Sequence, residues 1–245
     1  ASSVLMIEPK NFISNPQTVG DNFFQAILQD IALEDINNKA FSEFHGLREK
    51  LEQADIEVNV FSPDDSLVTP DEIFPNNWFS THENGTLITY PMLAENRRQE
   101  RRRNILNWLE KKYHKRIDLS INEKKNSFLE GTGSLVLDRI NKIAFSSLSE
   151  RTSTNLVFEW TRLMNYQSLF FSSFDKNEKL IYHTNVMFCL ADKFAIVCLE
   201  AIQTADEKRQ VKSKLEETNH EIIEISKNQL HHFCANCLQL QNKKG

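Results

Sequence analysis

The chain has 245 residues, of which 40% are hydrophobic and 26% are charged, and its formal net charge is −5. It is long enough to bury a large core in one domain or two, and its acidic balance argues against nucleic acid or an anionic membrane as a partner. We expect neither a membrane span nor a signal peptide, because the sequence lacks a long apolar run and a basic, apolar start. Four cysteines without the spacing of a disulfide framework predict free thiols, and therefore a cytoplasmic protein.

The predicted elements repeat in one order along the chain. A partial unit comes first, with strands at 4–7 and 56–61 on either side of an amphipathic helix at about 38–53. Three full units of strand, turn, strand, helix and strand follow, and residues 229–240 begin another. Their predicted elements are strands at 77–80, 86–91 and 116–120 with a helix at 94–113, strands at 134–138, 143–148 and 168–171 with a helix at 152–164, and strands at 186–190, 194–199 and 221–225 with a helix at 204–217.

Units that recur about every 50 residues are typical of a circular or propeller-like α/β array, in which equivalent loops open at one end. Glu130 precedes Gly131 and Gly133, two of only six glycines, which predicts a tight backbone or a close ligand. Arg151 follows the next strand, so a carboxylate and a guanidinium are expected at one end of a hairpin, where a polar substrate could be held. The equivalent loops of the neighbouring units hold Asp71, Asn76, Asn77 and His183.

Each of these residues also has a purely structural interpretation. Glu130 could close a turn, His183 could cap a strand, and Asn76 and Asn77 could form Asx turns after a proline. The basic run 97–103 is interpreted as a solvated helix face rather than a nucleic-acid site, because acids dominate the chain and no aromatic platform accompanies the run.

The cysteines raise the question of a metal site. Cys234 and Cys237, with two histidines close by, could bind zinc, but a second pair of ligands at the usual distance is missing. We therefore predict that these two cysteines are buried packing residues and that there is no metal site. Cys189 and Cys198 lie inside predicted apolar strands and are expected in the core.

Three motifs stand at these loop ends: F-P-N-N-W-F-S-T-H at 74–82, L-E-G-T-G-S-L-V-L-D at 129–138 and H-T-N-V-M at 183–187. Together they resemble motifs of the pentein superfamily of guanidine-modifying enzymes, which includes arginine deiminase, dimethylarginine dimethylaminohydrolase and the amidinotransferases. Within the superfamily the chain most resembles the bacterial citrulline utilisation hydrolases, from residue 4 to about residue 240. The resemblance implies a five-bladed α/β propeller and a single catalytic domain over 1–245.

In that superfamily a cysteine thiolate attacks the central carbon of a guanidino or ureido group, without a cofactor. The resemblance implies that Glu130 is the catalytic carboxylate and that His183 is the general acid and base. It further implies that the substrate is bound by Asp71, Asn76 and Asn77, and that its α-carboxylate is held by Arg97 and Arg151. The two asparagines depart from an acidic pair in the dimethylarginine enzymes. Amides suit a neutral ureido group such as that of citrulline better than a guanidinium cation.

The nucleophile is the main departure from the pattern. In the relatives it lies tens of residues beyond the F-x-x-N-x-L-Q-L stretch, which is 233–240 here, and neither Cys234 nor Cys237 matches it. We therefore expect that the last blade is incomplete at its C-terminal end and that the cysteine belongs to a longer protein. The resulting hypothesis is a hydrolase of a C–N bond in citrulline, arginine or a methylated arginine, acting through a covalent cysteine adduct.

Two alternatives stay open. One is a pentein that lacks the nucleophile and binds such ligands without turning them over, and the other is an amidinotransferase. In each case the expected partner is a small amino acid, and a homodimer is the assembly left open.

Overall fold

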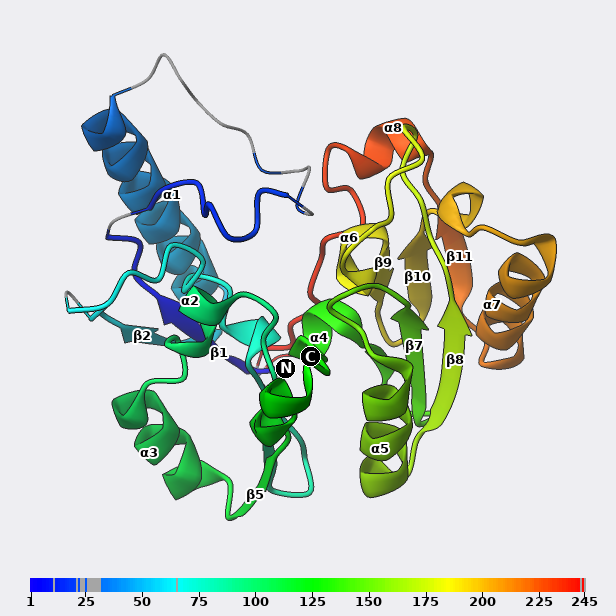
Figure 1. Ribbon diagram of the computed structural model, residues 1–245, viewed down its shortest axis with the longest axis horizontal. Coiled ribbons are helices and arrows are strands. Elements are labelled where there is room, and N and C mark those ends of the chain that lie inside the picture. The colour runs from blue at the N-terminus through cyan, green and yellow to red at the C-terminus, as the bar shows by residue number, and fades with distance from the viewer. Residues whose placement is uncertain are drawn as a thin grey trace.

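The computed structural model describes residues 1–10, 12–20, 22, 25, 32–64, 66–242 and 244, and its strands form four sheets that follow one another along the chain (Figure 1). The first sheet is a parallel pair, and each of the other three has three strands. The strands are β1 (Ser3–Ile7) and β2 (Glu57–Phe61); β3 (Phe79–Thr81), β4 (Thr86–Thr89) and β5 (Lys115–Asp118); β6 (Val136–Asp138), β7 (Ile143–Ser147) and β8 (Gln167–Phe171); and β9 (Phe188–Leu190), β10 (Phe194–Val197) and β11 (Glu221–Glu224).

The three-stranded sheets share one topology. In each, the first two strands form an antiparallel hairpin, and the third strand lies parallel to the second after a helical crossover. The crossover helices are α3 (Arg103–Lys112), α5 (Thr154–Met164) and α7 (Ala205–Glu217), and α1 (Leu33–Gln53) joins the parallel pair in the same way. The α/β class and the predicted repeat of strand, turn, strand, helix and strand are therefore confirmed. Within the described ranges the sheets are separate rather than one closed sheet, so the five-bladed ring and its incomplete last blade stay predictions.

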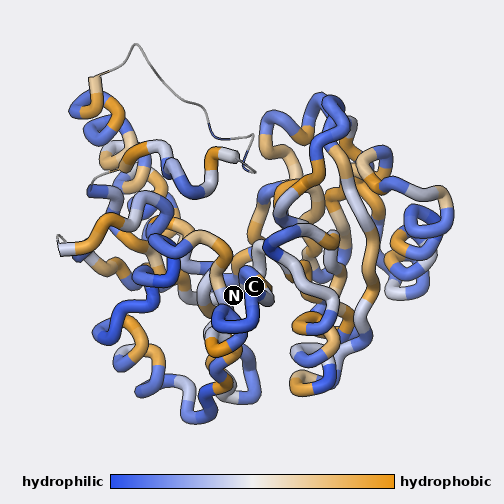
Figure 2. Tube along the Cα trace, viewed as in Figure 1, coloured by the Kyte–Doolittle hydropathy of each residue, from blue (hydrophilic) through white to orange (hydrophobic). Residues whose placement is uncertain are grey.

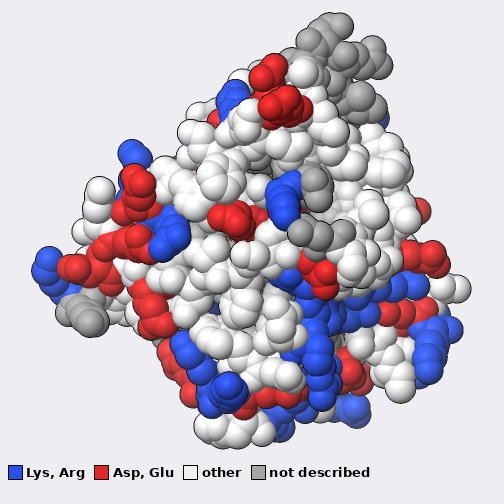
Figure 3. All heavy atoms as spheres, turned by 90° about the vertical axis from the view of Figure 1, so that its left-hand side faces the viewer, with Lys and Arg blue, Asp and Glu red and all other residues white. Residues whose placement is uncertain are grey.

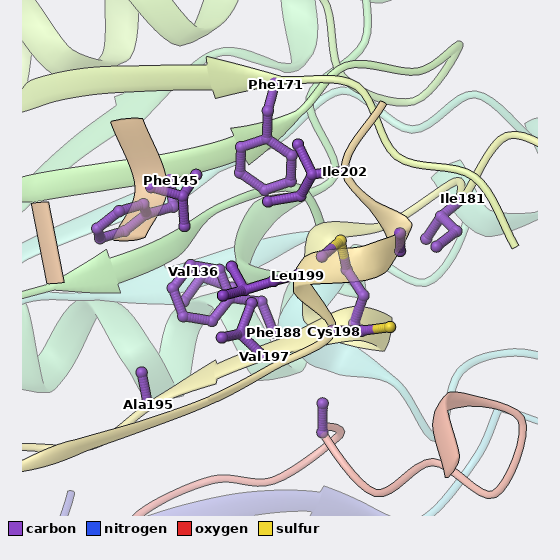
Figure 4. Packing of buried hydrophobic residues seen from close by; sticks show 14 of the residues in the cluster. Val136, Phe145, Phe171, Ile181, Phe188, Ala195, Val197, Cys198, Leu199 and Ile202 are labelled. Carbon is purple, nitrogen blue, oxygen red and sulfur yellow. The ribbon is translucent and has the colours of Figure 1, made fainter. Parts of the chain in front are cut away.

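The hydrophobic core is divided into clusters that lie between neighbouring units. The largest joins the third and fourth sheets, and Figure 4 shows Phe145, Phe171 and Phe188 packed together within it. The rings of Phe145 on β7 and Phe188 on β9 are 5.0 Å apart in a T-shaped arrangement. Burying one such side chain contributes roughly 2 kcal/mol to the free energy of folding. In Figure 2 hydrophobic residues follow the strands of these sheets, while hydrophilic stretches lie toward the outer helices and loops.

One-turn helices stand where the sequence analysis placed the starts of strands, which is a correction at three equivalent positions. They are η1 (Pro75–Asn77), α4 (Gly131–Ser134) and α6 (Thr184–Met187), and the strands β3, β6 and β9 begin only after them. In the first, Pro75 occupies the first helical position, where its missing N–H costs nothing. In the second, Gly131 takes a positive φ of 48°, which a residue with a Cβ rarely adopts.

The predicted helix at 94–113 is likewise two helices, α2 (Glu95–Arg98) and α3, separated by an extended Arg102. Buried side chains of this segment form ion pairs: Arg97 with Glu100 at 2.9 Å, and Arg102 with Glu72 at 3.9 Å. The remaining short helices are η2 (Ser120–Lys125), η3 (Leu199–Ala201) and α8 (Lys227–Leu230).

The two ends of the described chain lie side by side, as Figure 1 shows. The backbone N–H of Gln241 donates to the carbonyl of Ala1 at 2.8 Å. Among the described residues, no helix is both long and apolar enough to cross a membrane. Figure 3 shows the side of the first two sheets, where basic side chains gather in the lower part of the view with acidic ones interspersed.

Candidate functional site

The three one-turn helices bring the three sequence motifs together at one place. Helix α4 packs against both η1 and α6, so the loops that carry Asn77, Glu130 and His183 meet. Gly133 makes this approach feasible: a Cβ there would lie 2.4 Å from Asn77 Nδ2 and 2.8 Å from His183 Nδ1. Both side chains therefore lie against the same face of the Gly133 backbone.

Glu130 is fully buried at the centre of this site. Its Oε2 lies 2.8 Å from His183 Nε2, 3.4 Å from Arg151 Nη1 and 4.0 Å from Arg97 Nη1, and its Oε1 accepts the backbone N–H of Leu93 at 3.0 Å. Burial alone would raise the pKa of Glu130, but Arg151, His183 and Arg97 outweigh it and hold the pKa well below its usual range. Glu130 is therefore a carboxylate at neutral pH.

His183 is the partner of that carboxylate. Because an ionised Glu130 can only accept, the Nε2–H of His183 donates this hydrogen bond. Burial lowers the pKa of His183, although Glu130 opposes the shift, so the ring is neutral and Nδ1 carries a free lone pair. The neighbouring Tyr182 ring lies 4.7 Å from the imidazole and also lies 4.7 Å from the guanidinium carbon of Arg151. The arrangement can accept a proton at Nδ1 and return it.

Arg97 lies beside Glu130 with its donors directed to protein acceptors. Its Nε and Nη2 donate to the two oxygens of Glu100 at 2.9 and 3.0 Å, and its Nη1 donates to Asn77 Oδ1 at 2.8 Å. Nη2 also faces the backbone carbonyls of Asp71 and Phe74. The structure thus brings Arg97 and Arg151 to the same carboxylate, while their predicted contact with a substrate α-carboxylate stays a prediction.

Asp71 and Asn76 lie on the loop around η1. Asp71 Oδ2 is 3.8 Å from Arg97 Nε and accepts from Asn15 Nδ2 at 2.7 Å and from Thr18 Oγ1 at 3.3 Å. Asn76 contributes its backbone carbonyl, which would lie 2.3 Å from a Cβ on Gly131. A cavity of about 200 Å³ lies next to this loop and is lined by residues that include Thr69, Glu72 and Ile73.

The sequence analysis missed Glu100 and Asn15. It interpreted the run 97–103 as a solvated helix face, and this was wrong: Arg97 is 2%, Glu100 2% and Arg102 8% exposed. A spacing of three residues between Arg97 and Glu100 was the available signal, since such residues face each other on a helix.

Five charged residues of the site are linked by ion pairs, and we call them the acid–arginine cluster: Asp71, Arg97, Glu100, Glu130 and Arg151.

All four cysteines are free thiols. Cys189 and Cys198 are buried as predicted, and burial raises the pKa of each thiol to about 11, so neither is readily ionised. Cys234 and Cys237 are exposed, and their prediction as buried packing residues was wrong, because the segment after α8 runs along the surface. Within the ranges that the structure describes, no three His, Cys, Asp or Glu side chains are grouped to hold a metal ion.

Solved structures of known enzymes share this fold. The apo arginine dihydrolase ArgZ from cyanobacteria superposes with a TM-score of 0.74 at 16% identity, over 97% of this chain and 33% of that one. An AgrE mutant in a binary complex with L-arginine gives a TM-score of 0.75 at 18% identity over the same shares. DDAH from Pseudomonas aeruginosa, a mutant complexed with citrulline, gives 0.65 at 15% identity, over 97% of this chain and 80% of that one.

The chain therefore spans about a third of the full ArgZ and AgrE chains, but 80% of the isolated N-terminal domain of ArgZ. At these identities the likeness establishes a shared α/β fold. A comparison with curated proteins gave no match.

A family model described as N,N dimethylarginine dimethylhydrolase, eukaryotic, matches residues 8–245. That match covers nearly the whole chain, which accordingly belongs to this dimethylhydrolase family and, with ArgZ, AgrE and DDAH, to the pentein superfamily of guanidino-modifying enzymes.

Proposed function

We propose that the chain supplies the substrate-binding and proton-transferring groups of a hydrolase that breaks a C–N bond in a ureido or guanidino amino acid. Citrulline is our first candidate, followed by arginine and methylated arginine. The observation that carries the proposal is the buried 2.8 Å hydrogen bond between Glu130 and His183, with Arg151 and Arg97 beside the same carboxylate. It supports the proposal because a fixed, neutral imidazole with one free nitrogen is suited to general acid and base catalysis.

The roles proposed for the individual residues follow from their chemistry. Glu130 orients His183 and stabilises the imidazolium that forms during proton transfer. Asp71, Asn76 and Asn77 bind the planar nitrogen-rich group, and a guanidinium fork such as that of Arg151 suits the α-carboxylate of an amino acid. Among relatives in complexes, AgrE was captured with L-arginine and DDAH with citrulline, which is consistent with this class of ligand.

In the proposed reaction, a cysteine thiol gives its proton to His183 Nδ1 and the sulfur bonds to the central carbon of the ligand. His183 returns the proton to the departing nitrogen as the C–N bond breaks. Water then gives a proton to His183 and attacks the adduct, the S–C bond breaks, and the proton returns to sulfur. We propose that this cysteine lies in a segment following Gly245, since the thiols of Cys189 and Cys198 are buried with a raised pKa, and the exposed Cys234 and Cys237 do not match the position of the nucleophile in the superfamily.

The test is made on protein expressed from its complete reading frame. Incubated with citrulline, arginine and dimethylarginine, it should release ammonia and ornithine from citrulline, and Glu130→Gln should lower kcat by about a hundredfold or more. Arg101, which pairs with Glu123 away from His183, offers a control: Arg101→Lys should leave kcat unchanged. If none of the three compounds is turned over, the hydrolase proposal is wrong.

A second candidate is favoured by the buried, hard-to-ionise thiols of Cys189 and Cys198. In that case the chain binds the ligand without hydrolysis. Calorimetry of the 245-residue chain with citrulline should then show heat of binding that is lost in Glu130→Ala, with no ornithine formed even by the complete protein. An amidinotransferase would differ from both, since it would form a new amidino compound only when an acceptor amine is added.

A further inference from the structure

Asn77 and Glu100 are joined through Arg97 in a buried chain of hydrogen bonds. The Glu100 carboxylate binds Arg97 in a bidentate manner, at 2.9 and 3.0 Å, and only 1% of the Glu100 side chain and 3% of the Arg97 side chain are exposed. Arg97 Nη1 then donates to the side chain of Asn77 at 2.8 Å. A bidentate pair of this kind fixes the plane of the guanidinium group.

The identity of Arg97 decides which way the amide of Asn77 faces. A guanidinium has five N–H donors and no acceptor, so the Asn77 atom opposite Arg97 must be the carbonyl oxygen. The NH2 group therefore lies on the other side, where a Cβ on Gly133 would be 2.4 Å from Asn77 Nδ2 and 2.8 Å from His183 Nδ1. The amide thus presents N–H donors beside the free nitrogen of the proposed general base.

Glu100 is needed for this orientation because Arg97 has competing acids close by. Its Nε lies 3.8 Å from Asp71 Oδ2 and its Nη1 lies 4.0 Å from Glu130 Oε2, so both carboxylates attract it. The two hydrogen bonds from Glu100 hold the guanidinium away from either and leave Nη1 on Asn77. Without them, Arg97 would turn toward one of the competing carboxylates and release the amide.

We propose that Glu100 and Arg97 are positioning residues that hold the Asn77 amide with its N–H donors toward the ligand. An amide in this orientation favours a ureido group, whose carbonyl oxygen can accept from it beside His183. It disfavours a guanidinium, which offers only N–H donors. This inference rests on the proposed function and adds to it the element that selects the substrate class.

The test compares two substrates in four proteins made from the complete reading frame: the unaltered protein, Glu100→Gln, Asn77→Ala and the double variant. The measured quantity is kcat/KM for citrulline divided by kcat/KM for arginine, or the same ratio of association constants if the ligands are bound without turnover. Glu100→Gln should lower this ratio about tenfold, the equivalent of one hydrogen bond. Asn77→Ala should lower it as much, and the double variant no further than Asn77→Ala alone, because no amide is left to orient.

Two further variants separate this role from a structural one. Arg97→Lys keeps the charge but cannot make the bidentate pair, so it should lower the ratio as Glu100→Gln does and serves if Glu100→Gln fails to fold. Glu110→Gln is the control. It removes a carboxylate of α3 that pairs with Arg116 on β5, and it should leave the ratio unchanged.

An unchanged ratio in folded Glu100→Gln, or an equal drop in the Asn77→Ala background, would overturn the inference while leaving the proposed function intact. If the unaltered protein neither binds nor turns over citrulline or arginine, the proposed function and the inference both fall.

Discussion

The acid–arginine cluster holds three carboxylates against two guanidinium groups, so its charges do not balance. Glu130 faces both arginines and His183, and together these outweigh the effect of burial and keep its pKa low. Glu100 faces only Arg97, with Asp71 and Glu130 repelling it, and burial raises the pKa of Glu100 to about 7. Of the two glutamates, Glu100 is therefore the one that binds a proton as the pH falls below about 7, whereas above that pH its carboxylate is ionised and pairs with Arg97.

This imbalance predicts how stability depends on pH. Because the folded-state pKa of Glu100 is raised, the folded protein binds the proton more tightly than the unfolded chain between about pH 4.5 and 7. The contribution to the free energy of unfolding is full below that window and is lost as the pH rises through 7. Between pH 5 and 8 the loss should amount to roughly 2–3 kcal/mol relative to Glu100→Gln.

Urea unfolding of the unaltered protein and of Glu100→Gln across this range measures the difference in the free energy of unfolding. The contributions of the titrating groups that the two proteins share cancel in that difference. Glu130 acts with the opposite sign and in another window: its lowered pKa stabilises the fold above its ordinary pKa, and that contribution is lost as the pH falls. Parallel pH profiles of the two proteins from pH 5 to 8 would contradict a raised pKa at Glu100.

Single residues also show where sequence reasoning reached its limit. Glu130 and His183 could be singled out because each stands at a loop end beside a recognisable motif, and the structure places them 2.8 Å apart. Glu100 was missed because it sits in a run of arginines that is typical of an exposed helix face, and its spacing of three residues from Arg97 was the weak signal that pointed elsewhere. Asn15 lies in a loop whose place against Asp71 depends on contacts 56 residues apart in the sequence.

The one-turn helices η1, α4 and α6 are the elements that bring the site together. The strands and crossover helices could be predicted because hydrophobic periodicity and turn residues mark them over many residues. A helix of three or four residues leaves no periodic signal, and these three form because of what they pack against. Helix α4 in particular lies between η1 and α6, with glycines at its closest contacts.

Gly133→Ala tests that packing. The added methyl carbon would lie 2.4 Å from Asn77 Nδ2 and 2.8 Å from His183 Nδ1, so both must move. We expect a loss of about 1–3 kcal/mol in the free energy of unfolding and loss of citrulline binding by calorimetry. Gly46→Ala in α1 is the matched control, since nothing lies within 4 Å of its added carbon, and it should stabilise the helix by about 0.5–1 kcal/mol. Unimpaired citrulline binding by Gly133→Ala would show that α4 does not set the site.

At the scale of the whole molecule, the described residues form three core clusters rather than one, and these clusters join the sheets pair by pair. One cluster lies between the first two sheets, a second between the second and third, and a third between the third and fourth. The site residues come from the loops of three successive units, so their distances depend on how firmly each unit is attached to the next. The attachment of the second unit to the third includes a buried polar contact as well as apolar packing.

That contact is centred on Tyr90, which follows β4. Its hydroxyl accepts from Trp160 Nε1 on α5 at 2.8 Å and shares a 2.6 Å hydrogen bond with Ser80, which lies 2.9 Å from His82 Nε2. Burial lowers the pKa of His82 to about 3, so the network stays neutral at ordinary pH. Tyr90→Phe would leave the Trp160 N–H and the Ser80 hydroxyl without this partner, at a cost of about 1–3 kcal/mol.

Because the network spans two sheets, we expect Tyr90→Phe to weaken both together. Native-state hydrogen exchange should show amides of β4 and of α5 losing protection by similar amounts. Tyr166→Phe is the control: the Tyr166 ring lies 5.0 Å from the Trp160 ring, and this contact survives the change. If only β4 lost protection in Tyr90→Phe, the units would open independently. The buried hydroxyl would then be a local feature of the second sheet, and it would not fix the loops of the site relative to one another.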